Sequence, residues 1–209
     1  MANICSYCMK VTGEPDKIRE FIEVIQRDNY EEGRHFYRVF NADVMNEETI
    51  DDGWVQIIGS CAWSVYSCMM EGNATYSEKE FDKYQKTKQE IEALKKSPDL
   101  ASKNNYFFAK EKIEKEFLAS SLIRESKLLN LTIEVFSEEH GCCFEEHYVI
   151  KNGEVLVDEC VEAYEIYTED YESVEELNKE HGTNFSEYEF KEEMYLVKGG
   201  FGDWRFDEY

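Results

Sequence analysis

The sequence predicts an α+β protein, built as a ferredoxin-like antiparallel sheet with helices on one face, an inserted helical hairpin and a C-terminal β-hairpin extension. Three observations lead to this fold class. Apolar and polar residues alternate in several segments, which is typical of strands with one buried face. A helical repeat separates the first two predicted strands, as in a split βαβ unit. Asn152-Gly153 lies between two strand-like segments, which indicates a β-hairpin.

Three strands and one helix are predicted in the first part of the chain. Apolar and polar side chains alternate over residues 3–12, the first strand. The helix begins at Pro15, which suits a first helical turn, and is expected to end near Asp28–Asn29. A second strand is predicted over 35–44 and a third over 54–68. The near-continuous apolar character of the third predicts burial on both faces.

The middle of the chain predicts a helical hairpin. It is rich in Lys and Glu and almost free of Gly, and Ser97-Pro98 interrupts it once. Apolar residues at helical spacing favour a helix over 77–96, a turn over 97–105 and a helix over 106–129. The last two turns of the second helix are expected to dock on the sheet through Leu122, Ile123, Leu128 and Leu129.

Strands resume after the hairpin. They are predicted over 131–137, 144–150 and 154–167, the last two joined by the Asn-Gly turn. A short acidic helix follows over 172–181, with Ser173 as its N-terminal cap and Gly182 as its stop. Residues 194–200 and 203–209 are interpreted as one or two closing strands.

These elements divide the chain into a core and an insertion. The core combines 1–75 with 119–209, where 119–209 includes an acidic C-terminal extension, and the inserted hairpin covers 76–118. The chain has 209 residues, with 46 acidic and 23 basic side chains and a net charge of −23. The net charge is −7 over 1–75, +1 over 76–137 and −17 over 138–209. The acidic character therefore belongs mainly to the last third.

This composition excludes several functional classes. Direct nucleic-acid binding needs an excess of Lys and Arg on one face, and this chain has the opposite balance. No apolar stretch approaches the roughly 20 residues of a membrane span, and the N-terminus lacks the pattern of a secretion signal. Seven Cys, an odd number, indicate free thiols in a reducing compartment.

Several segments resemble a known family. The opening Met-Ala-Asn-Ile4-Cys5-Ser6, followed by Val11-Thr12-Gly13, is similar to the start of proteins with the YubB-type ferredoxin-like domain. Residues 59–68, 141–160 and the ending GGFGDWRF at 199–206 resemble later parts of that family. Ile4 stands where the family usually has Trp, and 76–118 is additional to its core pattern. The resemblance implies the fold and an origin on plasmids, phages or other mobile elements, and it carries no catalytic motif.

Several Cys, His and acidic residues could carry metal-ligand or catalytic chemistry. Cys5 and Cys8 are three apart on a predicted strand, so their thiols are expected to point to opposite faces. The cluster His140, Cys142, Cys143 and His147 approaches the spacing of a zinc site but lacks a second tight pair, and a metal-dependent enzyme built on it is the less favoured alternative. Paired carboxylates occur throughout without an ordered motif. We expect no enzyme activity, no cofactor and no metal.

The acidic run near the C-terminus is the candidate binding site. Residues two apart on a strand are separated by about 6.6–6.8 Å, a spacing similar to that of phosphates along a nucleic-acid strand. Carboxylates interleaved with Tyr would then imitate a phosphate backbone, and Tyr would supply rigid contact area. The predicted contact group is Glu162, Glu165, Glu169, Asp170, Glu172, Glu175 and Glu176. An acidic face that serves only solubility is the competing interpretation.

The leading hypothesis is a mobile-element-encoded inhibitor of a host defence nuclease, such as an anti-CRISPR or anti-restriction protein. Its partner would be a basic nucleic-acid-binding host protein, a CRISPR effector or restriction nuclease, whose channel accepts the acidic surface. Such an inhibitor acts in the cytoplasm of the bacterial host. The alternative is a non-catalytic plasmid or phage adaptor or structural protein that binds a protein partner through the helical hairpin at 76–118.

Overall fold

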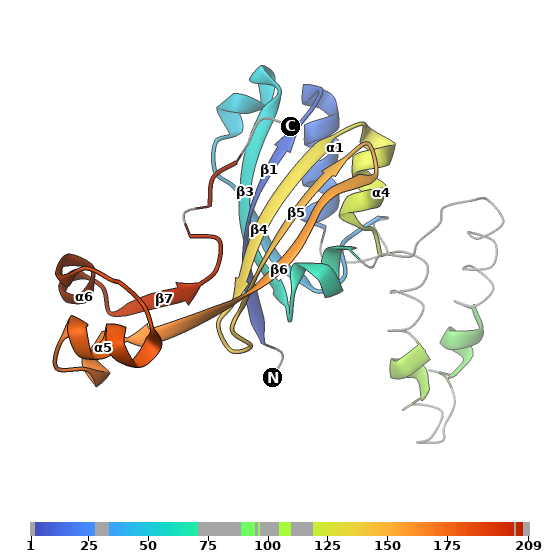
Figure 1. The fold of residues 1–209 in the computed structure, drawn as a ribbon. Helices are drawn as coiled ribbons and strands as arrows, with labels where there is room; N and C mark the ends of the chain where they lie inside the picture. Colours follow the sequence, from blue (N-terminus) through green and yellow to red (C-terminus); the bar gives the residue numbers. More distant parts are fainter. Residues whose placement is uncertain are drawn as a thin grey trace.

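The computed structural model describes residues 3–27, 34–70, 89–94, 96, 105–109, 119–202 and 204–206. Over these residues the chain forms one seven-stranded antiparallel sheet in the order β2-β3-β1-β4-β5-β6-β7, together with several helices (Figure 1). The strands are β1 (Ile4–Thr12), β2 (Val39–Val44), β3 (Trp54–Ala62), β4 (Thr132–Glu139), β5 (Phe144–Lys151), β6 (Glu154–Tyr167) and β7 (Tyr195–Gly199). The helices are α1 (Pro15–Ile25), α4 (Leu122–Leu129), α5 (Val174–His181) and α6 (Glu187–Glu192), with 3₁₀ turns η2 (Glu47–Asp52) and η5 (Thr168–Asp170) and a π-helical turn η3 (Tyr66–Met70). The predicted α+β class is confirmed.

The first strand and helix form as predicted. Along β1 the alternate apolar side chains from Cys5 to Val11 are buried on one face. Pro15 occupies the start of α1, where its fixed φ favours the first turn. Ile18 and Phe21 are fully buried on the side of α1 that faces the sheet. The helix ends at Ile25, slightly before the predicted end.

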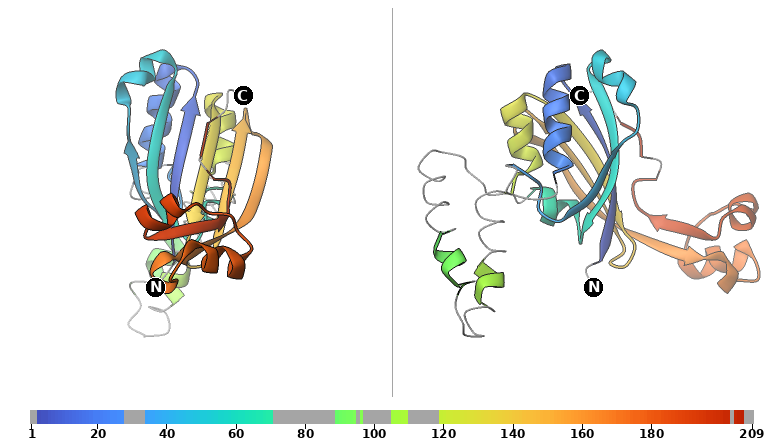
Figure 2. Two further views of the ribbon diagram at one scale, coloured as in Figure 1. Left: turned by 60° about the vertical axis from the view of Figure 1, so that its left-hand side comes forward. Right: turned by 180° about the vertical axis from the view of Figure 1, so that it is seen from behind.

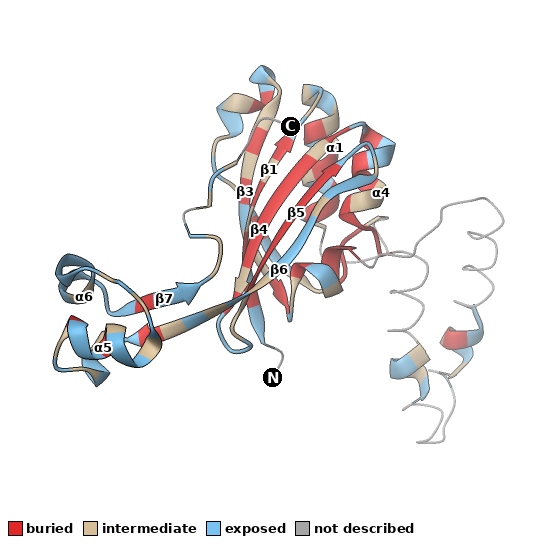
Figure 3. Cartoon of the chain, in the orientation of Figure 1, coloured by how far each residue is buried: buried red, intermediate tan, exposed pale blue. Residues whose placement is uncertain are grey.

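Two helices, α1 and α4, cover one face of the sheet. β1 and β2 both pair antiparallel with β3, which lies between them, so they run in the same direction and α1 connects them. α1 and α4 lie side by side on this face (Figure 2). The main hydrophobic core fills the space between them and the sheet, as the buried strand residues in Figure 3 show.

The third strand is shorter than predicted. β3 ends at Ala62, because Trp63 has a left-handed conformation with a φ of 68° and turns the chain away from the sheet. The chain then forms η3 instead of continuing as a strand. The prediction of burial on both faces is also wrong. Val55 and Ile57 are buried but Ile58 is exposed, as expected for an antiparallel strand with one core face.

The predicted long helix over 106–129 is interrupted. Ala119 forms a bridge with His35, and Ser121 is extended and caps a separate helix, α4, by accepting a hydrogen bond from the backbone N–H of Arg124. Leu122 and Leu129 dock in the core as predicted and Ile123 packs at its margin, whereas Leu128 is exposed. Within the predicted hairpin the structure describes only helical segments at 89–94 and 105–109, the single residue 96, and the end of its second arm from 119. The rest of that prediction lies outside the described residues.

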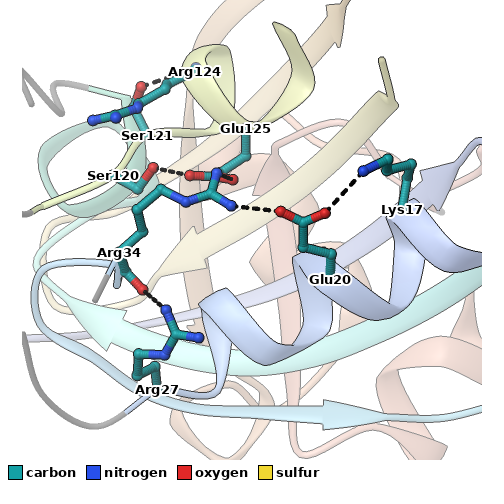
Figure 4. A network of polar contacts seen from close by, with 8 residues as sticks. All are labelled: Lys17, Glu20, Arg27, Arg34, Ser120, Ser121, Arg124 and Glu125. Atoms are coloured by element: carbon teal, nitrogen blue, oxygen red, sulfur yellow. Dashed lines mark hydrogen bonds and ion pairs between the residues drawn. The ribbon is translucent and has the colours of Figure 1, made fainter. Parts of the chain in front are cut away.

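A polar network fixes α4 to α1 (Figure 4). The Glu125 side chain is fully buried, and its Oε2 lies 2.6 Å from Nη1 of Arg34. Its other oxygen accepts a hydrogen bond from the Ser120 hydroxyl. Nη2 of Arg34 lies 2.7 Å from Oε1 of Glu20 on α1, and Glu20 also pairs with Lys17 at 3.0 Å. The chain is therefore held in place at the point where it returns from the predicted insertion.

The second half of the sheet is a meander of long strands. β4, β5 and β6 form as predicted, and Asn152 and Gly153 both have positive φ, 52° and 81°, as a tight hairpin turn requires. β6 has 14 residues and changes partner along its length. Its first part pairs with β5, and its last five residues pair with β7.

The C-terminal segment differs from its prediction. Residues 204–206 form no strand, and α6 was not predicted. The chain after β7 instead crosses the face of the sheet opposite the helices, where Phe201, Trp204 and Phe206 pack on Phe136. A further strand would have to pair with the edge of the sheet. This segment lies on the face of the sheet instead, because its aromatic rings pack there.

None of the described helices is long and apolar enough to cross a membrane.

Candidate functional site

The most acidic part of the molecule projects from the sheet as a separate lobe. We call residues 162–199 the acidic arm; it contains the end of β6, η5, α5, α6 and β7 (Figure 1). The arm has 12 acidic and three basic side chains, a net charge of −9. Eleven of the 12 carboxylate residues are exposed. The arm therefore presents to solvent −9 of the net −17 that the sequence places in residues 138–209.

A small core of its own supports the arm. Ile166 of β6, Leu177 of α5 and Leu196 of β7 are buried together. Three partly buried aromatic side chains, Tyr171, Phe185 and Phe190, pack around this cluster. Both helices and both strands of the arm therefore contribute an apolar side chain to the same small core. This core joins the strands and helices that carry the exposed carboxylates.

Both arm helices begin at serine caps. The Ser173 hydroxyl accepts a hydrogen bond from the backbone N–H of Glu176, and α5 ends at Gly182 with a φ of 68°, so both predicted boundary residues are confirmed. Ser186 and Glu189 form a reciprocal capping box at α6. The hydrogen bonds from Ser186 hold the pKa of the Glu189 carboxyl below its usual range.

The connection between α5 and α6 is held by one side chain. Nδ2 of Asn178 donates to the backbone oxygen of Phe185 at 2.8 Å, and its Oδ1 accepts from the Phe185 N–H at 2.9 Å. The same Oδ1 accepts from the Thr183 hydroxyl at 2.8 Å. These bonds satisfy the loop backbone and fix the position of α6 relative to α5.

The structure does not bring all seven predicted contact residues together. Five of them lie within eight consecutive residues, in η5, in the link after it and at the start of α5: Glu169, Asp170, Glu172, Glu175 and Glu176. We call these five the tip carboxylates, and all are exposed. Glu162 and Glu165 lie on β6, and because they are three residues apart they point to opposite faces of that strand.

Glu165 has local partners that the sequence did not indicate. Its Oε1 lies 2.9 Å from Nδ1 of His140, and its Oε2 accepts a hydrogen bond from the Tyr167 hydroxyl at 3.1 Å. Its side chain is only 18% exposed. Within the arm, the positions two before and two after Glu165 on β6 are Ala163 and Tyr167, so the predicted row of carboxylates at strand spacing is absent from this strand.

Further exposed carboxylates of the arm were missing from the predicted group. They lie on α5, on α6 and directly after α6: Glu180, Glu187, Glu189, Glu192 and Glu193. The pattern Ser186-x-x-Glu189 is a capping-box signature and would have predicted the start of α6. Recognising this helix would have placed its carboxylates with those of α5.

The basic side chains of the arm neutralise little of this charge. Lys191 pairs with Glu187 one helical turn away on α6. Lys198 donates to the backbone oxygen of His181 at 2.7 Å, which supports the end of α5. Both interactions are local, and no ion pair to a tip carboxylate is found in the described parts of the chain.

The side chains of the possible zinc cluster have separate partners. His147 lies on the sheet face opposite the helices, pairs with Glu134 at 3.0 Å and stacks on Phe136. His140 contacts Glu165, and Cys142 accepts a hydrogen bond from Asn3. Over the residues that the structure describes, no three His, Cys, Asp or Glu side chains are grouped to hold a metal ion.

The Cys5-x-x-Cys8 pair also diverges. Cys5 is buried under the helices and faces Cys61 across the strand pair. Cys8 lies on the other face, where its sulfur accepts a hydrogen bond from Gln56 at 3.0 Å. All seven cysteines are free thiols.

Comparison of the chain with protein-family models, curated proteins and solved structures gives no match.

Proposed function

We propose that this protein is a mobile-element-encoded inhibitor of a host defence nuclease, an anti-CRISPR or anti-restriction protein of the bacterial cytoplasm. It binds the basic nucleic-acid channel of its target through the acidic arm and performs no chemistry. The observation that carries the proposal is the combination of a net charge of −9 with a small apolar core in one projecting lobe. A basic channel that normally binds phosphates offers the complementary charge.

The position of the tip carboxylates supports this mode of binding. They lie at the far end of β6, away from the sheet, so they can enter a groove without a clash from the core (Figure 1). Glu175 and Glu176 also stabilise the first turn of α5 through the helix dipole, so part of the charge serves the fold as well. Glu169, Asp170 and Glu172 precede the helix, so the helix dipole does not explain their presence. Presentation of negative charge to a partner is the simplest explanation.

The proposed fold family is a ferredoxin-like core with an extension. The order β2-β3-β1-β4, with α1 after β1 and α4 before β4, supports a core of this type. β5, β6 and β7 extend the sheet from β4 and carry the arm. The resemblance to the YubB-type domain proteins supports an origin on a mobile element.

The proposal is tested by removing charge without changing shape. The arm variant combines Glu169→Gln, Asp170→Asn, Glu172→Gln and Glu175→Gln. The body variant makes the same change of four charges at exposed positions outside the arm, with Glu23→Gln, Glu47→Gln, Glu48→Gln and Asp52→Asn. A panel of CRISPR effectors and restriction nucleases is assayed for DNA cleavage with each protein.

The parent and the body variant should inhibit one nuclease of the panel equally. The arm variant should need at least about tenfold more protein for the same inhibition, because four complementary charges are lost from the contact. Equal inhibition by the arm and body variants would show that the arm does not make the contact.

A further inference from the structure

A concave site lies outside the acidic arm. It is a cavity of about 470 Å³ where the chain after β3 meets β5 and β6. We call it the aromatic pocket, because four of its lining residues are Trp63, Tyr66, Phe144 and Tyr148. Two carboxylate residues, Glu146 and Asp158, also line it. A volume of this size is typical of sites for small molecules.

Two of the four aromatic side chains that line the pocket, those of Trp63 and Tyr66, are partly exposed. Trp63 is 41% exposed and Tyr66 is 47% exposed, which is unusual for large rings at the edge of a core. Trp63 already interacts with one cation, because the Arg38 guanidinium lies 4.5 Å from its ring centre. Arg38 is not among the residues that line the pocket.

Glu146 is a buried carboxylate without a charged partner. It is only 3% exposed. Its oxygens accept hydrogen bonds from the backbone N–H groups of Val65 at 2.8 Å and Tyr66 at 3.3 Å, and from the hydroxyls of Ser137 at 2.8 Å and Tyr148 at 3.0 Å. All four donors are neutral, and the described residues include no ion pair to Glu146.

The negative charge therefore remains uncompensated beside the pocket. These hydrogen bonds hold the carboxylate in place but bring no positive charge to it, and a cation nearby would be attracted to it. Asp158, which is exposed on β6 and opposite Tyr148 in the strand register, adds a second negative charge. Burial, followed by these two carboxylates, raises the pKa of the neighbouring Cys160 thiol.

We propose that the aromatic pocket binds a small organic cation with an alkylated ammonium group. Such a group is attracted by the faces of aromatic rings and is only weakly hydrated, so it enters an apolar cavity more easily than a metal ion does. It would also supply the missing counter-charge to Glu146. An anion is disfavoured by both carboxylates, and a neutral apolar molecule would leave Glu146 uncompensated.

The first test compares two molecules of the same shape. Choline and 3,3-dimethylbutan-1-ol differ only in that a carbon replaces the charged nitrogen. Calorimetric titration of the full-length protein should show choline binding at least tenfold more tightly than the alcohol. If the two bind equally, or if choline does not bind at millimolar concentration, the pocket is not a cation site and the proposal is overturned.

The second test places choline in this pocket. Tyr66→Ala and Asp158→Asn each remove one exposed contribution and should weaken choline binding at least threefold, as expected for the loss of a cation–π contact or an attractive charge. The matched controls are Tyr188→Ala on α6 and Glu159→Gln on β6, both at exposed positions, and these should bind choline like the parent. Unchanged binding in both pocket variants would overturn the assignment.

Two further measurements show whether a change in choline binding comes from misfolding or from the acidic arm. Thermal unfolding followed by circular dichroism should give similar midpoints for the parent and the four single variants, since all the altered side chains are outside the main core. The arm variant described above should retain full choline binding. The result for the cation site is therefore independent of the result for the proposed inhibition.

Discussion

The Glu145 Oε2 atom accepts a hydrogen bond from the backbone N–H of Phe201 at 2.7 Å, across 56 residues of sequence. The same oxygen accepts from the indole Nε1–H of Trp204 at 3.3 Å. Glu145 is buried on β5, on the sheet face opposite the helices. This carboxylate therefore fastens the chain after β7 to the sheet, and with it the returning side of the acidic arm.

Replacing Glu145 by Ala should destabilise the protein. The change leaves two donors near the sheet without their acceptor, which costs about 1–3 kcal/mol of unfolding free energy for a buried group. Urea unfolding of Glu145→Ala should show this loss. Glu159→Ala, at an exposed position of β6, is the control and should stay within about 0.5 kcal/mol of the parent. Equal stability of the two variants would mean that Glu145 does not fasten the segment.

The buried pair of Arg34 and Glu125 should matter far more than the exposed pair beside it. Arg34→Ala leaves the fully buried Glu125 carboxylate without its partner, and breaking such a pair typically costs about 3–5 kcal/mol. Lys17→Ala removes the more exposed pair to Glu20 and should cost less than about 1 kcal/mol. The difference is measured by urea unfolding of both variants. A similar loss in the two would contradict the structural assignment.

Protonation of Glu189 should weaken the cap of α6. Hydrogen bonds from Ser186 hold the pKa of Glu189 below its ordinary value, so this stabilisation is present above the unfolded pKa. It is lost as the pH falls through the lowered folded pKa. Carbon-detected NMR titration of Ser186→Ala should give a higher Glu189 pKa than the parent. The pKa of Glu187, which its hydrogen bond to Lys191 lowers, should not change in this variant.

Deletion of the predicted insertion separates the two functional hypotheses. A protein in which a short Gly-Ser linker replaces residues 78–118 keeps the acidic arm and loses the predicted hairpin. Inhibition of the target nuclease should persist if the arm makes the contact. Loss of inhibition, with the thermal midpoint preserved, would favour the adaptor hypothesis, in which the hairpin binds the partner.

Binding through the arm should depend strongly on salt. Carboxylates that replace phosphates in a basic channel gain from long-range attraction, which salt screens with a Debye length of about 8 Å at 0.15 M. The dissociation constant for the target should rise steeply between 50 and 300 mM NaCl for the parent. The arm variant should show a shallower slope, and parallel slopes would exclude the tip carboxylates as the charged contact.

Local signals explain which elements the sequence predicted well. Ser173 and Gly182 bound α5 as predicted, because a serine cap and a left-handed glycine act within one helical turn. The Asn152-Gly153 turn is a signal of the same kind. β1 was predicted from alternation that reflects one buried face, and its register with β3 and β4 follows from the same face.

The incorrect predictions involve residues that are distant in sequence. Ser121 ends the predicted long helix because Ala119 pairs with His35, a contact over 84 residues that no helical pattern contains. Glu165 was assigned to the contact group because it lies in the acidic run. Nothing in the sequence indicates its pairing with His140. The aromatic pocket was not predicted either, since Tyr66 and Asp158 are distant in sequence and line the same cavity only in the folded chain.

The acidic arm starts and finishes at neighbouring points of the sheet, since Ala163 and Gly199 are direct partners in the pairing of β6 with β7. A lobe attached in this way can be exchanged as a cassette, because a new segment needs only to join the same two positions. Under the proposed function, exchange of this lobe would change which target is bound while the sheet and its main core stay unaltered. Transplanting the lobe onto another hairpin of matching register is the engineering counterpart of that exchange.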